Sequence, residues 1–304
     1  MKLDSTIFEI LYGVEIEFDV KGVSQASNLK EATLAFSLTI TSSLEEQLRQ
    51  ISNVVIFLPV GEELPEDCYQ GNIVIHVINP RYEYIKTASR AIKKDLPLDD
   101  GAVLLSYVHQ SANIDKSVVI EPFCFIGPNC TIKAGCHLHT GVKIIENVVV
   151  GRDTKIGPNS VIGMKGFGIE RDNGLKREVI PFGGRPLKMP HFGGVRIDDG
   201  CDIGALNTIC AGAIEPTIIG KDVMTDDHVH IAHNCKIEAG VAIAACAEIS
   251  GSVLIEEECW VGPNVSIMQK VTIGRASTIG IGSVVRKSMP PQSVVAGNPA
   301  RIIK

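Results

Sequence analysis

A short segment of the chain concentrates residues that can move protons. His228, His230 and His233 lie within six residues of one another, and Asn234 follows directly. Imidazole titrates at about pH 6.5, so a histidine here could take a proton from an amine that attacks a thioester. Two other interpretations stay open. The segment could be a polar strand edge, or it could be a zinc site, which needs three or four converging ligands.

These histidines lie within a six-residue repeat. An aliphatic residue recurs at every sixth position from Ile114 to Ile162, and again from Ile231 to Val285. A helix with about 3.6 residues per turn would spread these positions around its surface, so the period argues against a helix. A six-residue unit fits a short strand plus a corner, with one aliphatic side chain pointing inward. The repeat predicts a parallel β-helix in which three units form one coil and about seven to eight coils stack.

The small residues of the repeat have predictable places. Glycine directly follows many of the repeating aliphatic residues, and we expect it to supply the positive φ and the close approach of a tight corner. Several cysteines fall four residues after a repeating aliphatic residue, at a second inward position where a small hydrophobe fits. Disulfide or metal roles are the alternative for these cysteines, which are Cys124, Cys130, Cys136, Cys201, Cys235 and Cys259.

The period also places a backbone donor beside His233. Gly251 follows His233 by eighteen residues, which is one coil. Its N–H can therefore lie above the imidazole, and a backbone N–H beside a base is what a tetrahedral oxyanion requires. We predict His233 as the general base and Gly251 as the oxyanion donor.

Outside the repeat, the sequence predicts a second domain. Residues 43–51 are typical of an amphipathic helix, 53–58 and 73–78 of strands, and 82–94 of a further helix. We therefore expect a small N-terminal α/β domain over residues 1–110 that binds the nucleotide or sugar. The β-helix would occupy residues 111–304, with an inserted loop over 163–196 that is functional or mobile.

Composition excludes several classes of partner. The chain of 304 residues has a formal net charge of −6, which argues against nucleic acid. No apolar stretch approaches the roughly 18 residues of a membrane span. The first residues lack the basic and apolar regions of a signal peptide, so we expect a cytoplasmic protein without membrane insertion. We expect no bound metal or cofactor.

Several motifs resemble one family, the UDP-3-O-acylglucosamine N-acyltransferases (LpxD) of lipid A synthesis. They are DDHVHIAHNCKI at 226–237, GFG at 166–168, PHFGGVRI at 190–197 and DIGALNTI at 202–209. Segments 21–38 and 77–92 extend the resemblance into the N-terminal domain. The resemblance implies a left-handed β-helix, a homotrimer with active sites between subunits, and amide formation on a nucleotide-linked amino sugar.

The resemblance also implies roles for single residues. Asp226, His230 and Asn234 match positions that line the sugar site or support the base, and Phe36 matches a residue that stacks on the nucleotide base. Core packing is the alternative role for Phe36. A second histidine of the family falls on Lys270 here, and residues 39–42 lack the family's Asn-Pro-Lys-Tyr. The base could therefore be thymine or another base instead of uracil.

The C-terminal segment resembles a different group. Residues 282–304 are similar to the closing coil of CoA-dependent hexapeptide acetyltransferases, and they replace the helices with which LpxD proteins engage acyl carrier protein. Arg286, Lys287, Arg301 and Lys304 are then candidates for contacts with CoA phosphates. Their alternative role is that of solvated charges at the end of a domain.

We therefore predict an acyltransferase that joins an acyl group from acyl-CoA to the amine of a nucleotide-linked amino sugar, in surface-glycan or lipopolysaccharide synthesis. The alternative is an LpxD enzyme proper that uses acyl carrier protein. A further alternative from another class is a metalloenzyme like the γ-carbonic anhydrases, or a non-catalytic scaffold.

Overall fold

The computed structural model describes residues 6–88, 106–171 and 184–304. The chain forms two compact units. One contains Met1–Asp100 and Gly168–Pro190, and the other contains Gly101–Phe167 and His191–Lys304. No helix within the described ranges has the length and apolar character needed to cross a bilayer.

The first unit is built on a four-stranded parallel sheet. Its strands are β1 (Gly22–Val23), β2 (Thr33–Phe36), β3 (Val55–Pro59) and β4 (Ile73–Val77), in the order β1-β2-β3-β4. The central strand β3 is buried from Val55 to Leu58, as its continuous apolar run predicts. The strands predicted over 53–58 and 73–78 are confirmed to within two residues at each end.

Four helical segments accompany this sheet: α1 (Thr6–Tyr12), α2 (Ser42–Gln50), the 3₁₀ helix η1 (Glu66–Tyr69) and α3 (Pro80–Ala88). Helix α2 begins after Thr41, whose hydroxyl accepts the Leu44 N–H at 3.2 Å. Helix α3 begins two residues earlier than the predicted 82–94, because the Asn79 side chain accepts the Tyr82 N–H. Residues of the predicted helix beyond 88 lie outside the described ranges.

The insertion contributes to this first unit. Strands β15 (Ile169–Arg171) and β16 (Pro186–Lys188) pair antiparallel. The Asn79 amide, just before α3, donates to the Arg171 carbonyl at 3.4 Å. We expected the whole insertion to belong with the β-helix at 111–304. Instead, residues 168–190 cluster with the N-terminal unit, because this hairpin contacts α3.

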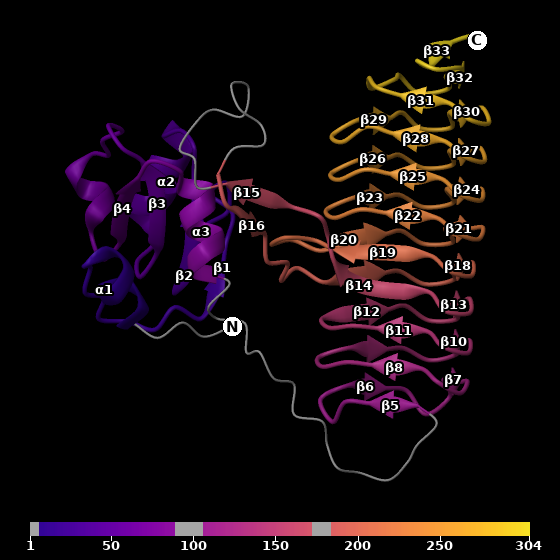
Figure 1. Ribbon diagram of the computed structural model, residues 1–304, viewed down its shortest axis with the longest axis horizontal. Coiled ribbons are helices and arrows are strands. Elements are labelled where there is room, and N and C mark those ends of the chain that lie inside the picture. The colour runs from indigo at the N-terminus through magenta and orange to yellow at the C-terminus, as the bar shows by residue number, and fades with distance from the viewer. Residues whose placement is uncertain (1–5, 89–105, 172–183) are drawn as a thin grey trace. The chain divides into compact units, whose positions relative to one another are not determined.

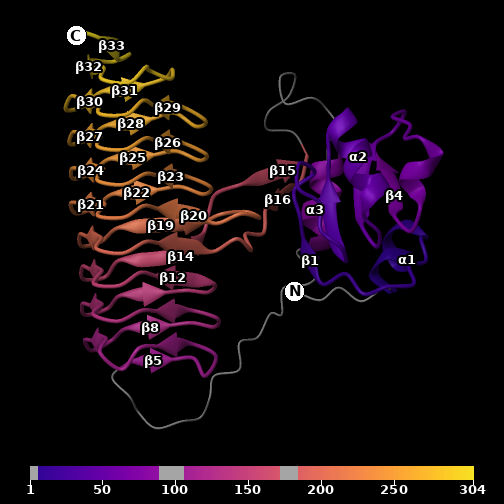
Figure 2. The ribbon, with the colours of Figure 1, turned by 180° about the vertical axis from the view of Figure 1, so that it is seen from behind.

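The second unit is a parallel β-helix with three sheets, visible as a stack of coils in Figures 1 and 2. The ten-stranded sheet contains β7 (Val119–Ile120), β10 (His137–Leu138), β13 (Lys155–Ile156), β18 (Asp202–Ile203), β21 (Met224–Thr225), β24 (Ala242–Ile243), β27 (Trp260–Val261), β30 (Thr278–Ile279), β32 (Val294–Ala296) and β33 (Arg301–Ile302). The nine-stranded sheet contains β5 (Tyr107–Val108), β8 (Phe125–Ile126), β11 (Lys143–Ile144), β14 (Val161–Lys165), β19 (Thr208–Ala211), β22 (His230–Ile231), β25 (Glu248–Ile249), β28 (Ser266–Ile267) and β31 (Val284–Val285). The eight-stranded sheet contains β6 (Asn113–Ile114), β9 (Thr131–Ile132), β12 (Val148–Val150), β17 (Val195–Ile197), β20 (Thr217–Ile219), β23 (Lys236–Ile237), β26 (Leu254–Ile255) and β29 (Thr272–Ile273).

Register confirms the predicted unit of three strands per coil. Ile231 pairs with Ile249 and Ile237 with Ile255, each one coil apart. Across the insertion, Val150 pairs with Ile197, so the coil continues as if the inserted residues were absent. The nine-stranded sheet gives more coils than the seven to eight we expected.

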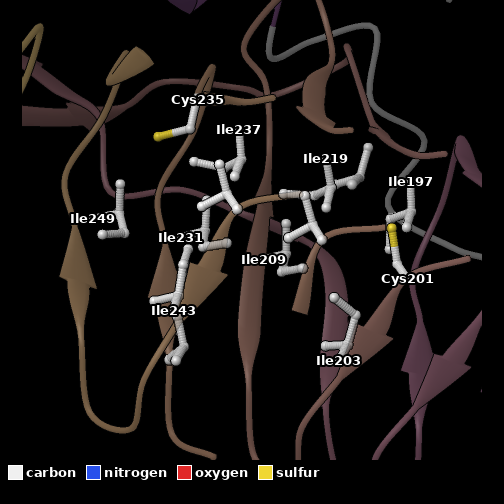
Figure 3. Packing of buried hydrophobic residues seen from close by; sticks show 14 of the residues in the cluster. Ile197, Cys201, Ile203, Ile209, Ile219, Ile231, Cys235, Ile237, Ile243 and Ile249 are labelled. Carbon is white, nitrogen blue, oxygen red and sulfur yellow. The ribbon is translucent and has the colours of Figure 1, made fainter. Parts of the chain in front are cut away.

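The interior of the β-helix is a single apolar column. Figure 3 shows isoleucines from the three sheets meeting inside the coils, with Cys201 and Cys235 among them. The six cysteines predicted to point inward are each at most 2% exposed, which confirms their packing role. All nine cysteines are free thiols.

The corners depart from our expectation about glycine. Left-handed φ values recur three residues after the repeating aliphatic residue, at positions such as Asn159, Asn234 and Gly240. Of the glycines directly after the aliphatic residue, Gly163 alone has a positive φ among the described residues. The others serve close approach: a Cβ added to Gly127 would lie 1.6 Å from the Ile145 carbonyl oxygen.

Candidate active site

His233 lies at the corner that joins the nine-stranded sheet to the eight-stranded sheet. It follows β22, precedes β23 and is half-buried. Two earlier coils leave their regular path at this same corner, first between β14 and β17 and then between β19 and β20. The residues of these two excursions, together with the following coil, form the surroundings of His233.

Asn234 holds the imidazole in one orientation. Its side-chain oxygen lies 3.1 Å from His233 Nδ1 and also accepts the Ala213 N–H at 3.0 Å. Its amide nitrogen donates to the Glu215 carbonyl at 3.1 Å, so the amide cannot be turned over without losing both backbone contacts. His233 therefore donates from Nδ1, and this tautomer leaves Nε2 with a lone pair.

Gly251 closes over the opposite edge of the ring. A Cβ at position 251 would lie 2.7 Å from both Nε2 and Cε1 of His233, so only glycine fits here without moving the ring. The Gly251 carbonyl accepts the Lys270 N–H at 3.0 Å, whereas its own N–H donates to no protein acceptor within the described ranges. The predicted pair of His233 and Gly251 is thus brought together by the coil repeat.

The structure adds His191 to this group, which our sequence analysis did not single out. Its ring is 2% exposed and meets the His233 ring edge-on, with centroids 5.5 Å apart at 68°. Gly166 completes this side: a Cβ there would lie 2.9 Å from His191 Nε2 and 3.1 Å from His233 Cδ2. Both residues belong to the excursion between β14 and β17.

Glycines after His191 keep that segment close to the solenoid. Gly193 donates to the Gly212 carbonyl at 2.9 Å, and Gly212 donates to the Gly194 carbonyl at 3.0 Å. A Cβ at Gly193 would lie 2.4 Å from the Glu215 carbonyl oxygen, and Gly194 has φ +67°. The signal available in the sequence was this pair of glycines in PHFGGVRI, directly before the six-residue period resumes.

This arrangement is suited to acyl transfer. Nε2 of His233 can accept a proton from an attacking amine, because Nδ1 is already committed to Asn234. Gly251 lies beside the same ring edge, and its N–H is a candidate donor to a carbonyl oxygen on which negative charge develops. The site therefore offers a candidate base, a side chain that orients its ring, and a candidate backbone donor.

The other predicted sugar-site residues are spread along the same coils. His230 lies on β22 and pairs with Thr208 and Glu248 on the neighbouring coils. Asp226 is at the preceding corner, after β21, where its side chain accepts the Asp227 N–H at 2.8 Å. Lys270 is exposed with φ +62°, and its backbone N–H donates to the carbonyl of Gly251, which lies one coil after His233. The structure brings Asn234 and Gly251 to the His233 ring, whereas Asp226 lies one corner away.

Phe36 lies at the end of β2 in the other unit. Its half-buried ring packs against Tyr84, with centroids 4.9 Å apart at 44°. Tyr84 is 2% exposed, and burial raises the pKa of its hydroxyl well above the usual range. Phe36 is therefore packed against Tyr84 and still partly accessible.

A pocket of about 580 Å³ lies at the last coils of the β-helix. Its lining includes Arg286, Lys287 and Arg301, three of the four cations predicted to meet CoA phosphates. Lys304 is not part of this lining; its backbone N–H and carbonyl group pair with Val294 instead.

Comparison with known proteins identifies the class of protein to which this architecture belongs. Residues 216–251 match the family described as bacterial transferase hexapeptide (six repeats), and residues 117–152 match the hexapeptide repeat of succinyl-transferase. In structure, the chain resembles LpxA from Acinetobacter baumannii, with a TM-score of 0.56 and 26% identity over 66% of this chain and 72% of that one. It also resembles the UDP-N-acetylglucosamine acyltransferase of Francisella novicida, with a TM-score of 0.54 and 29% identity over 64% and 65%. The fold is the left-handed β-helix of the hexapeptide-repeat acyltransferases.

Sequence relatives narrow the class to a family. The UDP-3-O-acylglucosamine N-acyltransferase of Delftia acidovorans is 39% identical over 245 residues, which cover 80% of this chain and 69% of the relative. The chain belongs to this LpxD-like family. The enzymes of that name from Bordetella parapertussis and Bordetella avium are 43% and 40% identical over 34% and 43% of this chain. Those two matches span only 27% and 34% of the relatives' own lengths.

Proposed function

We propose that the protein transfers an acyl group from a thioester to the amine of a nucleotide-linked amino sugar. The observation that carries this proposal is the position of His233, whose Nδ1 contacts Asn234 while its Nε2 faces Gly251. The names of the relatives favour UDP-3-O-acylglucosamine as the acceptor, in lipid A synthesis. This was our alternative interpretation, and it has more support than a broader acyl-CoA-dependent enzyme.

The proposed reaction mechanism follows from the groups at the two edges of the His233 ring. The amine nitrogen attacks the thioester carbonyl, and Nε2 of His233 accepts the proton that the new ammonium loses. The Gly251 N–H donates to the oxyanion of the tetrahedral intermediate. When the intermediate collapses, the C–S bond breaks and the protonated histidine returns its proton to the leaving thiolate.

We propose that Phe36 offers its accessible face to the nucleotide base. The tilted contact with Tyr84 fixes the ring from one side, and aromatic stacking on a fixed ring costs little side-chain entropy. Thr41 of the segment that departs from the family pattern is engaged as the N-cap of α2. The base contacts made elsewhere in the family by that segment must come from other groups here.

We propose that the pocket at the last coils takes the phosphate end of the acyl donor. Arg286, Lys287 and Arg301 converge on it, and guanidinium and ammonium groups suit phosphate. CoA and the prosthetic group of acyl carrier protein both carry phosphopantetheine.

The double substitution Lys287→Ala/Arg301→Ala should raise KM for acyl-CoA with little change in kcat, and the increase in KM should shrink with rising salt. Turnover with acyl carrier protein alone would assign the donor to the carrier instead.

We also propose a homotrimer in the cytoplasm. A corner of one β-helix presents a convex surface, so a second subunit must supply the other wall of a cleft. The exposed apolar side chains Met224 and Trp260, 56% and 50% exposed on the ten-stranded sheet, favour association. Nine free thiols fit a reducing compartment.

The direct test is amide formation from UDP-3-O-acylglucosamine and an acyl thioester, followed by mass spectrometry. His233→Ala should lower kcat by about 10²–10⁴-fold, the usual contribution of a positioned general base. His228→Asn is the matched control, because His228 is exposed with φ +59° and asparagine tolerates that conformation. A correctly folded His233→Ala variant with wild-type kcat would remove His233 from the mechanism.

A further inference from the structure

A second group of ionisable side chains lies on the β-helix away from His233. Glu121 follows β7, and His137 and His139 lie on and after β10, on successive coils of the ten-stranded sheet. His137 and His139 are two residues apart on extended backbone, so both side chains leave the same face of the sheet. Glu121 lies next to His139 because His137 pairs with Val119 and Leu138 with Ile120.

The three side chains converge on one point. Glu121 Oε1 lies 2.8 Å from His137 Nε2 and 3.0 Å from His139 Nδ1. The two imidazole rings stack with centroids 4.0 Å apart at 30°. Each side chain is 33% exposed, so an ion from solvent can reach the group.

The carboxylate is fixed and ionised. Its other oxygen, Oε2, accepts the Thr140 N–H at 2.8 Å, which orients the group as an outer hydrogen bond orients a metal ligand. That backbone hydrogen bond and the contact with His137 hold the pKa of Glu121 below its usual range. The site therefore provides two imidazoles and one anionic oxygen.

We propose that Glu121, His137 and His139 bind a divalent transition-metal ion, with Zn²⁺ as the best match. Two imidazoles and a carboxylate are a common three-ligand set for zinc, with ligand distances of about 2.0–2.2 Å. Each imidazole would bind the metal in its neutral form, through the nitrogen that faces Oε1, with its proton on the other ring nitrogen, and water would complete the coordination. Within the described ranges, this is the one group of three histidine, cysteine or acidic residues whose ligand atoms lie within 4.8 Å of one another.

The ligands come from two neighbouring coils, so the metal would join them. The interior is less complete at these first coils, where Ile114 and Ile120 are only partly buried. A metal bound here would stabilise the start of the β-helix. It would leave the His233 corner unchanged, because the two groups share no residue.

The experiment uses untagged full-length protein in a Cys246→Ser background, since Cys246 is the exposed cysteine. Calorimetric titration of chelator-treated protein should show one Zn²⁺ per chain, and Co²⁺ should give visible absorption bands. Glu121→Gln, His137→Gln and His139→Gln should each weaken Zn²⁺ binding at least about tenfold, because even outer-shell changes cost that much. Zinc should raise the melting temperature of the parent protein and not that of these variants.

His109→Gln is the control, because it removes a half-buried histidine at the same end of the β-helix but on the nine-stranded sheet. It should bind Zn²⁺ like the parent. Equal melting temperatures of the metal-free variants would show that they fold. Absence of saturable uptake at micromolar Zn²⁺, or equal uptake by the three variants and the parent, would overturn the proposal.

Discussion

At the scale of single residues, the candidate site depends on two neighbours with separate tasks. His233 carries the lone pair, and Asn234 carries the hydrogen bonds that fix the ring. Asn234 also occupies the left-handed corner position, with φ +59°. Asparagine is among the few residues that adopt this conformation readily, so one side chain serves both the turn and the imidazole.

Replacing Asn234 by glycine separates these tasks. Asn234→Gly keeps the corner conformation but removes the acceptor for His233 Nδ1. We expect kcat to fall about 10–100-fold with KM nearly unchanged, because a hydrogen bond to a group that becomes charged contributes about 1.5–3 kcal/mol. Asn264→Gly is the matched control, since Asn264 has φ +54° at the same position of a later six-residue unit, at a different corner. Equal kcat values for the two variants would contradict the orienting role.

Sequence alone predicted the part of the site that obeys the period. The spacing of one coil places Gly251 against His233. Asn234 was singled out by the resemblance to the family, and its side chain lies beside the ring. His191 and Gly166 could not be found in this way, because they belong to an excursion that has no register with the coils. Their approach to His233 depends on backbone contacts of Gly193 and Gly212, which leave no periodic signal.

At the scale of the elements, strands of two or three residues form because each coil provides hydrogen-bonding partners for the next. Ala232 donates to the Ile249 carbonyl at 2.9 Å, and the same bond recurs along the stack. Glycines at the position after the inward aliphatic residue lie close to the next coil, as Gly127 does to the Ile145 carbonyl. Sequence analysis placed glycines there correctly but assigned them the wrong backbone conformation. The period alone does not distinguish a glycine needed for close approach of two coils from a glycine needed for a positive φ.

The substitution Gly127→Ala tests the close approach of neighbouring coils at this position. A methyl group at Gly127 would overlap the Ile145 carbonyl, and backbone must move to make room. We expect the free energy of unfolding to fall by about 1–3 kcal/mol, as for other overpacked sites. Urea titration would measure it. Ala244→Gly reverses the change at the equivalent position of another six-residue unit, directly after β24, and should cost about 1 kcal/mol or less. A larger loss for Ala244→Gly than for Gly127→Ala would contradict the close approach.

At the scale of the whole molecule, buried thiols are part of the interior of the β-helix. Eight of the nine cysteines are buried, and several of those in the β-helix donate to a carbonyl group of the neighbouring coil, as Cys136 does to Gly151 at 2.8 Å. Burial raises the pKa of Cys201 to about 11 and that of Cys235 to about 12. The folded interior therefore keeps these thiols protonated at high pH.

Stability should consequently decline in alkali. Thiols of the unfolded chain ionise near pH 9, whereas Cys201 and Cys235 stay protonated in the folded state until about pH 11–12. These two thiols should add no pH dependence to the free energy of unfolding well below pH 9. Above it, stability should fall by up to about 1.4 kcal/mol per pH unit for each such thiol. Urea titrations of Cys201→Ala between pH 8 and 10 should show a shallower decline than the wild type, and parallel curves would refute the assignment.

Assembly is the second property of the whole molecule that can be measured directly. Light scattering should give about 98 kDa, three times the 32.7 kDa chain. Trp260→Glu places a charge on the exposed apolar surface and should lower this mass at micromolar protein. A fully active species of 32.7 kDa would contradict the shared cleft.

The stacking of coils has one last consequence, for the way in which the molecule opens. Each inner coil contacts a neighbouring coil on both sides, whereas a terminal coil contacts only one. Thermal fluctuations should therefore unfold the β-helix from its ends. His233 follows β22, which has five strands before it and three after it in its sheet. A site at this position is protected from local unfolding of the ends. The amides of β22 should therefore exchange with deuterated solvent far more slowly than those of β5 or β31.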